Sequence, residues 1–141
     1  MLHLLIVAHA PLASAMRGVA AHLNAEAAGE IAVCDVRPDE SRDDVRKAIE
    51  TQLAGIGASD TLILTDVFSA TPCNVAAEFA NRPGVRVLSG LNVTMLWRAL
   101  SHLNDSLDRA VELLVAGGKQ AVMQVTFTGP AEPGQETTGQ P

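Results

Sequence analysis

Two residues of the chain combine a reactive side chain with a place at the end of an apolar run. His9 follows the run Leu2–Ala8, and Asp66 stands near the end of the run Thr61–Val67. A neutral histidine attacks through one ring nitrogen when a carboxylate accepts a hydrogen bond from the other nitrogen and so fixes the tautomer. The pair therefore predicts a nucleophile, His9, whose ring is oriented by Asp66.

The residues after Asp66 suit an incoming phosphoryl group. Ser69-Ala70-Thr71-Pro72 is typical of a loop and a helix start, with Thr71 as the capping residue and Pro72 in the first helical position. Unpaired backbone N–H groups at a helix start attract phosphate oxygens, and Thr71 adds a hydroxyl. Ser69, Ala70 and Thr71 are the predicted phosphoryl-binding residues. A plainer interpretation is that Asp66 and Thr71 only cap the helix, but capping does not explain their convergence with His9.

The other three histidines have no comparable position. His3 lies inside the first apolar run, His22 lies late in the first helical segment, and His102 ends a later one. We interpret these three as surface or packing residues.

Apolar runs that alternate with helical segments predict the elements that position the site. The predicted strands are Leu2–Ala8, Glu30–Val36, Thr61–Val67 and Val85–Ser89, and the predicted helices cover about 12–27, 41–54, 71–80, 93–102 and 106–116, with Gly117-Gly118 ending the last. This order predicts an α/β fold with a doubly wound, mostly parallel sheet of strand order about 2-1-3-4. Strands one and three are then neighbours at the switch point, where such sheets bind ligands.

The end of the chain has a different character. Gln120–Val125 (QAVMQV) predicts a short fifth strand, whereas residues 127–141 are rich in Pro, Gly, Thr and Glu and predict a disordered tail. We therefore expect one domain over residues 1–126.

Composition excludes several classes of function. The net charge of −6, without a cluster of Lys and Arg, argues against nucleic-acid binding. Cys34 and Cys73 form no metal-ligand spacing, so neither a metal nor another cofactor is expected. The apolar start of the chain is too short to span a bilayer and lacks the positive segment of a signal peptide. We expect a cytoplasmic protein without membrane insertion.

Three segments carry a resemblance to a known family. LLIVAHAPLASAM, ILTDVFSATPCNVAAE and VLSGLNVTMLWRAL follow one another in the order and spacing of the mannose-type enzyme IIA domain of the bacterial phosphoenolpyruvate-dependent sugar phosphotransferase system. The resemblance covers about residues 1–126. A strand ending in Asp, followed by an aromatic residue, two small residues and Thr-Pro-x-Asn, is its most specific part.

The resemblance implies a phosphocarrier. His9 would accept a phosphoryl group from the phosphohistidine of HPr, Asp66 would orient the ring, and Thr71 would contact the phosphoryl group. His9 would then pass the group to an enzyme IIB component, or its phosphorylation would signal to a regulatory target. The family also implies a homodimer in which the last short strand pairs with the neighbouring subunit's sheet.

The chain departs from the family pattern at two places. Family members usually carry Gly after the histidine, where this chain has Ala10-Pro11, and Gly-Gly where it has Ser69-Ala70. Glycine allows unusual backbone dihedrals and close approach to a phosphate, so these replacements bear on partner choice and transfer rate.

Two alternatives from other classes remain open in the sequence. A tetrapyrrole chelatase-like, metal-binding enzyme would need a second ligand facing His9, for which His102 is the candidate. A non-catalytic interaction module would need no reactive His9 at all. The chain has neither the G-x-S-x-G pattern of serine hydrolases nor the G-x-G-x-x-G and P-loop patterns of nucleotide-binding proteins.

Overall fold

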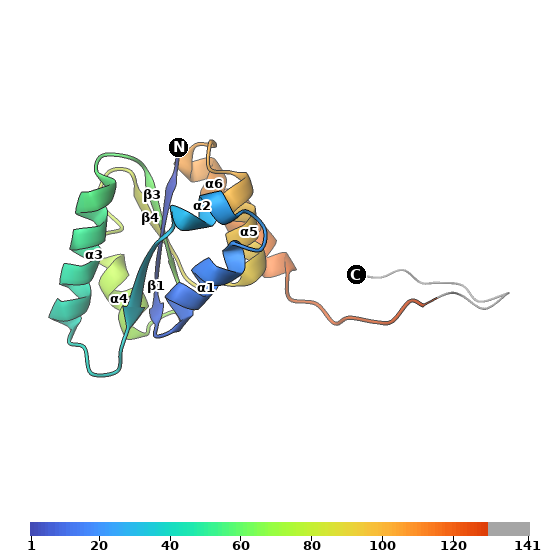
Figure 1. Cartoon of the computed structure of the whole chain (residues 1–141), viewed down its shortest axis with the longest axis horizontal. Coiled ribbons are helices and arrows are strands. Elements are labelled where there is room, and N and C mark those ends of the chain that lie inside the picture. The colour runs from blue at the N-terminus through green and yellow to red at the C-terminus, as the bar shows by residue number, and fades with distance from the viewer. Residues whose placement is uncertain (130–141) are drawn as a thin grey trace.

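The computed structural model describes residues 1–129, which form one four-stranded parallel sheet with helices on both faces (Figure 1). The strand order is β2-β1-β3-β4, as the alternation of elements predicts. The elements are, in chain order, β1 (His3–His9), α1 (Leu12–Ala20), α2 (Ala25–Gly29), β2 (Ala32–Val36), α3 (Arg42–Ile56), β3 (Thr61–Thr65), α4 (Thr71–Ala77), β4 (Val85–Leu88), α5 (Val93–Ser101) and α6 (Leu107–Gln120).

Each face of the sheet carries its own apolar core. Alternate residues of β1 point to opposite faces: Leu4 and Ile6 pack with α1, α2, α5 and α6, whereas Leu5 and Val7 pack with α3 and α4 (Figure 1). Strands that are buried on both faces need continuous apolar runs, which is why β1 and β3 are so evident in the sequence.

The register of the two central strands places the predicted pair at one edge. Val7 lies opposite Thr65 in the parallel β1–β3 ladder, so His9 and Asp66 follow within two residues on neighbouring strands. The carboxyl ends of β1 and β3 therefore meet as expected for this strand order.

The first helical segment is interrupted, contrary to the predicted continuous helix over about 12–27. The helical hydrogen bonds of α1 end near Ala20, and Asn24 begins α2 by accepting a hydrogen bond from the Ala27 N–H through its side chain at 3.0 Å. Asn is a strong N-cap residue and a poor residue for a helix interior, so it favours a new start at this position.

The last helix runs further than predicted, because Gly117 and Gly118 lie inside α6 instead of ending it. Both glycines are buried against α5. A Cβ atom at Gly117 would overlap Cδ and Nε of Arg98, and one at Gly118 would lie 3.0 Å from Cε of Met95. The glycines thus serve close helix packing, and their helix-breaking tendency is overridden by tertiary contacts.

The predicted strand over Gln120–Val125 is not present in this single chain. Gln120 is the last residue of α6, and residues 122–129 have no regular secondary structure and lead away from the sheet (Figure 1). A strand requires a neighbouring edge to satisfy its backbone groups, and this segment meets none. Of the predicted tail, residues 130–141 lie outside the described residues. Among residues 1–129, no helix is long and apolar enough to cross a membrane.

Candidate functional site

Asp66 holds His9 through two hydrogen bonds at the carboxyl edge of the sheet. One carboxylate oxygen, Oδ2, accepts from the His9 backbone N–H at 3.0 Å and lies 2.8 Å from Nδ1 of the His9 ring. The other oxygen, Oδ1, accepts from the Val67 N–H at 2.9 Å. The structure thus brings together the two residues that the sequence predicts as a pair.

This geometry fixes the tautomer of the ring. An ionised carboxylate can only accept, so the proton of a neutral His9 ring must lie on Nδ1 and the lone pair on Nε2. The His9 side chain is 52% exposed, whereas that of Asp66 is only 9% exposed. The His9 ring is therefore accessible to solvent, whereas the carboxylate that it contacts is shielded.

The pKa of Asp66 lies below its ordinary value. Burial by itself raises the pKa of this carboxyl, but the hydrogen bonds from the His9 backbone, the His9 ring and the Val67 backbone stabilise the anion and outweigh it. Asp66 is therefore ionised throughout the neutral range and acts as a fixed negative charge beside Nδ1.

The backbone around Asp66 is tied to the segment that follows β4. The Gly90 N–H donates to the Asp66 carbonyl at 3.0 Å, and the Leu91 N–H donates to the Thr65 carbonyl at 2.9 Å. The fully buried Thr65 hydroxyl donates to the Leu88 carbonyl at 3.0 Å. These bonds leave the orienting carboxylate little freedom to move relative to β1.

The loop from Val67 to Ala70 contains an unusual backbone conformation. Ser69 has a φ of 72°, the left-handed region that favours glycine, and its carbonyl accepts a hydrogen bond from the Asn74 side chain at 2.9 Å. The resemblance noted in the sequence implies glycine at this position, and glycine adopts this conformation without strain. Ala70 has φ −86° and ψ 166°, which any residue adopts.

The predicted phosphoryl-binding residues differ in the hydrogen-bond donors that they have available. Thr71 is the first residue of α4 and Ala70 is its N-cap, so the predicted capping role of Thr71 is wrong and its hydroxyl is not engaged in a cap. The Ala70 N–H already donates to the Val67 carbonyl at 3.2 Å, whereas within residues 1–129 the N–H groups of Ser69, Thr71 and Cys73 have no intramolecular acceptor. Ser69, Thr71 and the start of α4 thus present donors at this edge, and Ala70 does not.

Asp35 is a further residue of this edge that the sequence analysis did not single out. Asp35 lies on β2, opposite Ala8 of β1. Its carboxylate accepts hydrogen bonds from the Ser14 backbone N–H at 3.0 Å and from the Ser14 hydroxyl. Pro11, the N-cap of α1, makes no side-chain cap, so Asp35 satisfies the start of that helix instead. The signal in the sequence was an acid inside an otherwise apolar strand.

The remaining histidines lie away from His9. His102 follows α5, and its neighbour Leu103 accepts a hydrogen bond from the Leu2 N–H at 2.6 Å, at the start of β1. His9 is at the carboxyl end of β1, whereas His102 lies near its amino end. The two histidines are therefore at opposite ends of the strands and cannot share a metal ion. The chelatase-like site is therefore excluded in the form proposed. Within the part of the chain described here, no three His, Cys, Asp or Glu side chains gather as a metal site.

Comparison with known proteins places this site in a family context. Residues 3–115 match the family described as PTS system fructose IIA component. None of the curated proteins matches the chain significantly in sequence.

Solved structures share the fold. The mannose/sorbose-specific IIA subunit of the phosphotransferase system from Enterococcus faecalis has a TM-score of 0.84 at 23% identity, with 92% of this chain and 98% of that chain covered. The phosphotransferase system component EIIA from Streptococcus agalactiae has a TM-score of 0.77 at 25% identity, covering 88% and 97%. The PTS IIA protein associated with the fucose utilization operon from Streptococcus pneumoniae has a TM-score of 0.76 at 20% identity, covering 87% and 92%.

Replacement of Ser69 by glycine tests the strain in the loop. A non-glycine residue in the left-handed region destabilises the folded state by about 1–2 kcal/mol. Glycine removes this strain, but it also raises the entropy of the unfolded chain, which offsets part of the gain in stability. We expect Ser69→Gly to raise the free energy of unfolding by up to about 1 kcal/mol in urea denaturation. Ser59→Gly, at a residue whose own φ is not positive, should lower it slightly. Equal destabilisation by both substitutions would show that Ser69 is not strained.

Proposed function

Because the chain belongs to the family of fructose IIA components of the phosphotransferase system, and is thus a phosphocarrier of that system, we propose that His9 is the residue that carries the phosphoryl group. The hydrogen bond between His9 Nδ1 and Asp66, at 2.8 Å, is the single observation that carries this proposal. In the neutral ring this hydrogen bond puts the lone pair on Nε2, on the side of the half-exposed ring that faces away from Asp66, which is the arrangement a histidine nucleophile needs.

The transfer step follows from this arrangement. Nε2 of His9 attacks the phosphorus of a phosphohistidine on the donor, the new N–P bond forms as the donor's N–P bond breaks, and the donor nitrogen recovers its electron pair. The His9 ring gains positive charge as the bond forms, and the fixed Asp66 carboxylate stabilises that charge through the Nδ1–H. Transfer from His9 to an acceptor is the same step in reverse.

Donors for the phosphoryl oxygens come from the loop that follows Asp66. The Thr71 hydroxyl and the N–H groups of Ser69 and Thr71 are the groups that we assign to this role, since they have no acceptor within residues 1–129. Ala70 contributes by shaping the loop, because its N–H is already engaged.

The partners follow from the family and from the surface beside the site. HPr is the donor that the family implies, and an enzyme IIB component or a regulatory target is the acceptor. Val67 and Phe68, 55% and 77% exposed, stand next to Asp66 and offer an apolar contact at this edge. Because this exchange takes place between cytoplasmic proteins, we place the chain in the cytoplasm.

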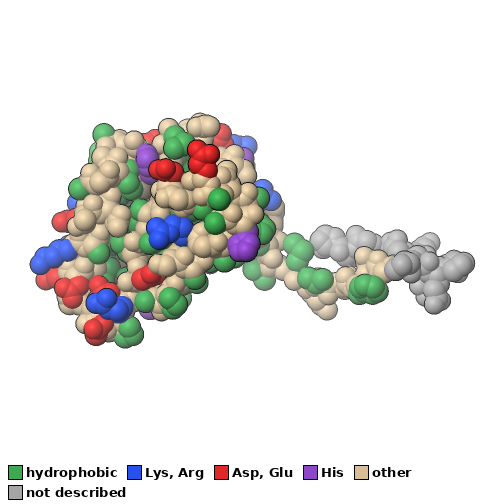
Figure 2. All heavy atoms as spheres, viewed as in Figure 1, with side chains coloured by type: hydrophobic (Ala, Val, Ile, Leu, Met, Phe, Trp, Pro, Cys, Tyr) green, Lys and Arg blue, Asp and Glu red, His purple; other side chains and the backbone are tan. Residues whose placement is uncertain are grey.

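We further propose a homodimer in which the C-terminal segment supplies a strand to its partner. The side chains of Val122, Val125 and Phe127 are 87%, 85% and 93% exposed, and apolar side chains line the segment where it leaves the domain (Figure 2). β4 is an edge strand of the sheet, with backbone groups free to pair on its outer side. Met123, Val125 and Phe127 alternate along the segment, so in a strand they would share one face. Within residues 1–129 neither this segment nor the outer side of β4 has a strand partner, so the two are complementary in two copies of the chain.

Intact-mass analysis after incubation with phosphoenolpyruvate, enzyme I and HPr tests the carrier. The wild-type protein should gain one acid-labile phosphoryl group, His9→Ala should gain none, and His22→Ala, which alters an exposed histidine elsewhere, should behave as wild type. No gain in the wild-type protein with any HPr would leave a non-catalytic interaction module. A gain retained in His9→Ala would assign the chemistry to another residue.

The rate of transfer in Asp66→Asn tests the orienting carboxylate. The amide oxygen can still accept from Nδ1–H, but the charge is lost and the amide NH2 replaces the oxygen that accepts from the Val67 N–H. Hydrogen bonds to charged groups are worth about 1.5–3 kcal/mol, so transfer should slow by roughly ten- to a hundredfold. The matched control is Asp105→Asn, because Asp105 lies 2.8 Å from His102 Nδ1 at the far edge; it should leave transfer unchanged.

The same pair has a pH signature in unfolding experiments. The pKa of Asp66 is depressed in the folded state, so its contribution to stability is present above its unfolded pKa of about 3.9 and is lost as the pH falls through the folded pKa. The stability difference between wild type and Asp66→Asn should therefore be constant near neutral pH and shrink in acid. A difference that does not shrink below the unfolded pKa of about 3.9 would contradict the assigned role.

Removal of the apolar side chains of the C-terminal segment tests the dimer. The triple substitution Met123→Ser, Val125→Ser and Phe127→Ser should convert a dimer in light scattering to a monomer, while Thr126→Ser and Thr128→Ser in the same segment should not. A wild-type protein that is monomeric at high concentration, or a triple variant that remains dimeric, would rule out this mode of pairing.

A further inference from the structure

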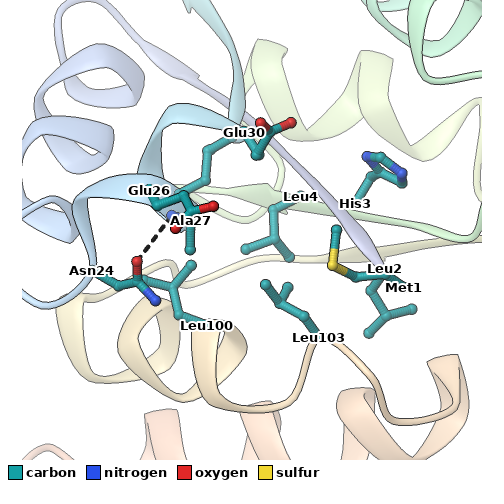
Figure 3. Close-up of a pocket in the computed structure, with 11 residues that line it drawn as sticks. Met1, Leu2, His3, Leu4, Asn24, Glu26, Ala27, Glu30, Leu100 and Leu103 are labelled. Atoms are coloured by element: carbon teal, nitrogen blue, oxygen red, sulfur yellow. Dashed lines mark hydrogen bonds between the residues drawn. The ribbon is translucent and has the colours of Figure 1, made fainter.

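A cavity of about 440 Å³ lies at the edge of the sheet opposite His9. It opens between the start of β1, α2 and the region where α5 ends (Figure 3). β1 spans His3 to His9, so at about 3.3 Å per residue the cavity and the phosphoryl site lie about 20 Å apart. The phosphocarrier role makes no use of this cavity.

The cavity owes its shape to the interruption of the first helical segment. α1 ends at Ala20, and α2 begins anew after Asn24. Because of this restart, Ala27 in α2 and its C-cap residue Glu30 lie at the wall of the cavity facing β1 (Figure 3).

The floor of the cavity is apolar. Leu4 and Ile31 are each 3% exposed, and the half-buried Leu100 and Leu103 approach from the other side (Figure 3). A volume of this size with an apolar floor and a few polar groups is in the range of small-molecule sites.

The rim carries negative charge. Glu26 and Glu30 are four residues apart and so lie on one face of the chain at α2 (Figure 3). Within residues 1–129 neither carboxylate takes part in an ion pair, and neither Lys nor Arg lines the cavity. The terminal residue Met1 also lines it, 69% exposed, without an ion pair to either carboxylate.

We propose that this cavity binds a small organic cation, an amine with a compact apolar body. The apolar body would occupy the leucine floor, and the ammonium group would lie at the rim between Glu26 and Glu30. The other titratable groups of the lining are the His3 side chain and the amino terminus of Met1, and within residues 1–129 neither forms an ion pair with these carboxylates. Asn24, whose Oδ1 is engaged with the Ala27 N–H at 3.0 Å, presents its amide at the same rim and limits the space there. An anion of the same shape would be repelled by the two carboxylates.

Titration of the ¹⁵N-labelled chain with phenethylamine and with 3-phenylpropionate tests the proposal, because the two probes match in size and differ in charge. Phenethylamine should bind with a Kd on the order of millimolar, as expected for so small a ligand. It should shift amide resonances near residues 2–4, 24–31 and 100–103 and leave those near His9 and Asp66 unchanged. 3-Phenylpropionate should cause no shift.

Two variants separate charge from shape. The double substitution Glu26→Gln and Glu30→Gln keeps the outline of the rim and should weaken phenethylamine binding by roughly three- to tenfold. Glu112→Gln, an exposed acid on α6, is the control and should change nothing. Ala27→Leu fills the cavity from α2 and should abolish binding, with far-UV circular dichroism confirming that the fold is kept.

Several results would overturn the proposal. Three of them concern the probes: equal binding of both probes, unchanged phenethylamine affinity in the double variant, and no resonance shifts at high phenethylamine concentration. The fourth is a set of shifts at the cavity that appears when the protein concentration alone is raised, which would assign the cavity to contact with a second copy of the chain. None of these depends on His9, and His9→Ala should bind the amine as wild type does. Failure here is therefore distinct from failure of the phosphocarrier assignment.

Discussion

The parallel pairing of β1 with β3 is the constraint on which the rest of the structure depends. Both strands are apolar on both faces, so polar alternation does not set their register. Hydrogen bonds outside the ladder mark its two ends: the His3 N–H donates to the Asp60 carbonyl at 2.9 Å, and the His9 N–H donates to Asp66 Oδ2 at 3.0 Å. A slip of one residue would break both bonds. The bond that positions the site is thus also one that fixes the sheet.

Asp66 has more bonds than an orienting residue alone requires. It accepts three N–H hydrogen bonds, two from backbone groups and one from the ring, and two of the three persist whatever the state of the His9 side chain. The carboxylate is therefore held as an anion in one position while the ring beside it gains and loses charge. A charge that is already in place costs no reorganisation during transfer, which is the advantage of a preorganised site.

The strands were predictable because burial on both faces leaves uninterrupted apolar runs, and the positions of His9 and Asp66 follow from the ends of those runs. Three features depended on contacts that the sequence does not display. The restart at Asn24 depends on a side-chain cap, and the continuation of α6 through Gly117 and Gly118 depends on the approach of Arg98 and Met95. The role of Asp35 requires that β2 lie beside the start of α1, which only the tertiary structure provides.

The two buried glycines near the end of α6 also affect the reach of the chain beyond it. Each glycine weakens a helix by about 1 kcal/mol relative to alanine, so the last turn from Gly117 to Gln120 is held mainly by its packing on α5. A residue advances the chain by about 1.5 Å in a helix and about 3.3 Å in an extended strand. Unwinding these four residues would lengthen the C-terminal segment by about 7 Å, but it would give up the packing of Gly117 and Gly118 on α5. The end of α6 is thus an anchor set by tertiary contacts, and it fixes the point from which the C-terminal segment can reach a neighbouring molecule.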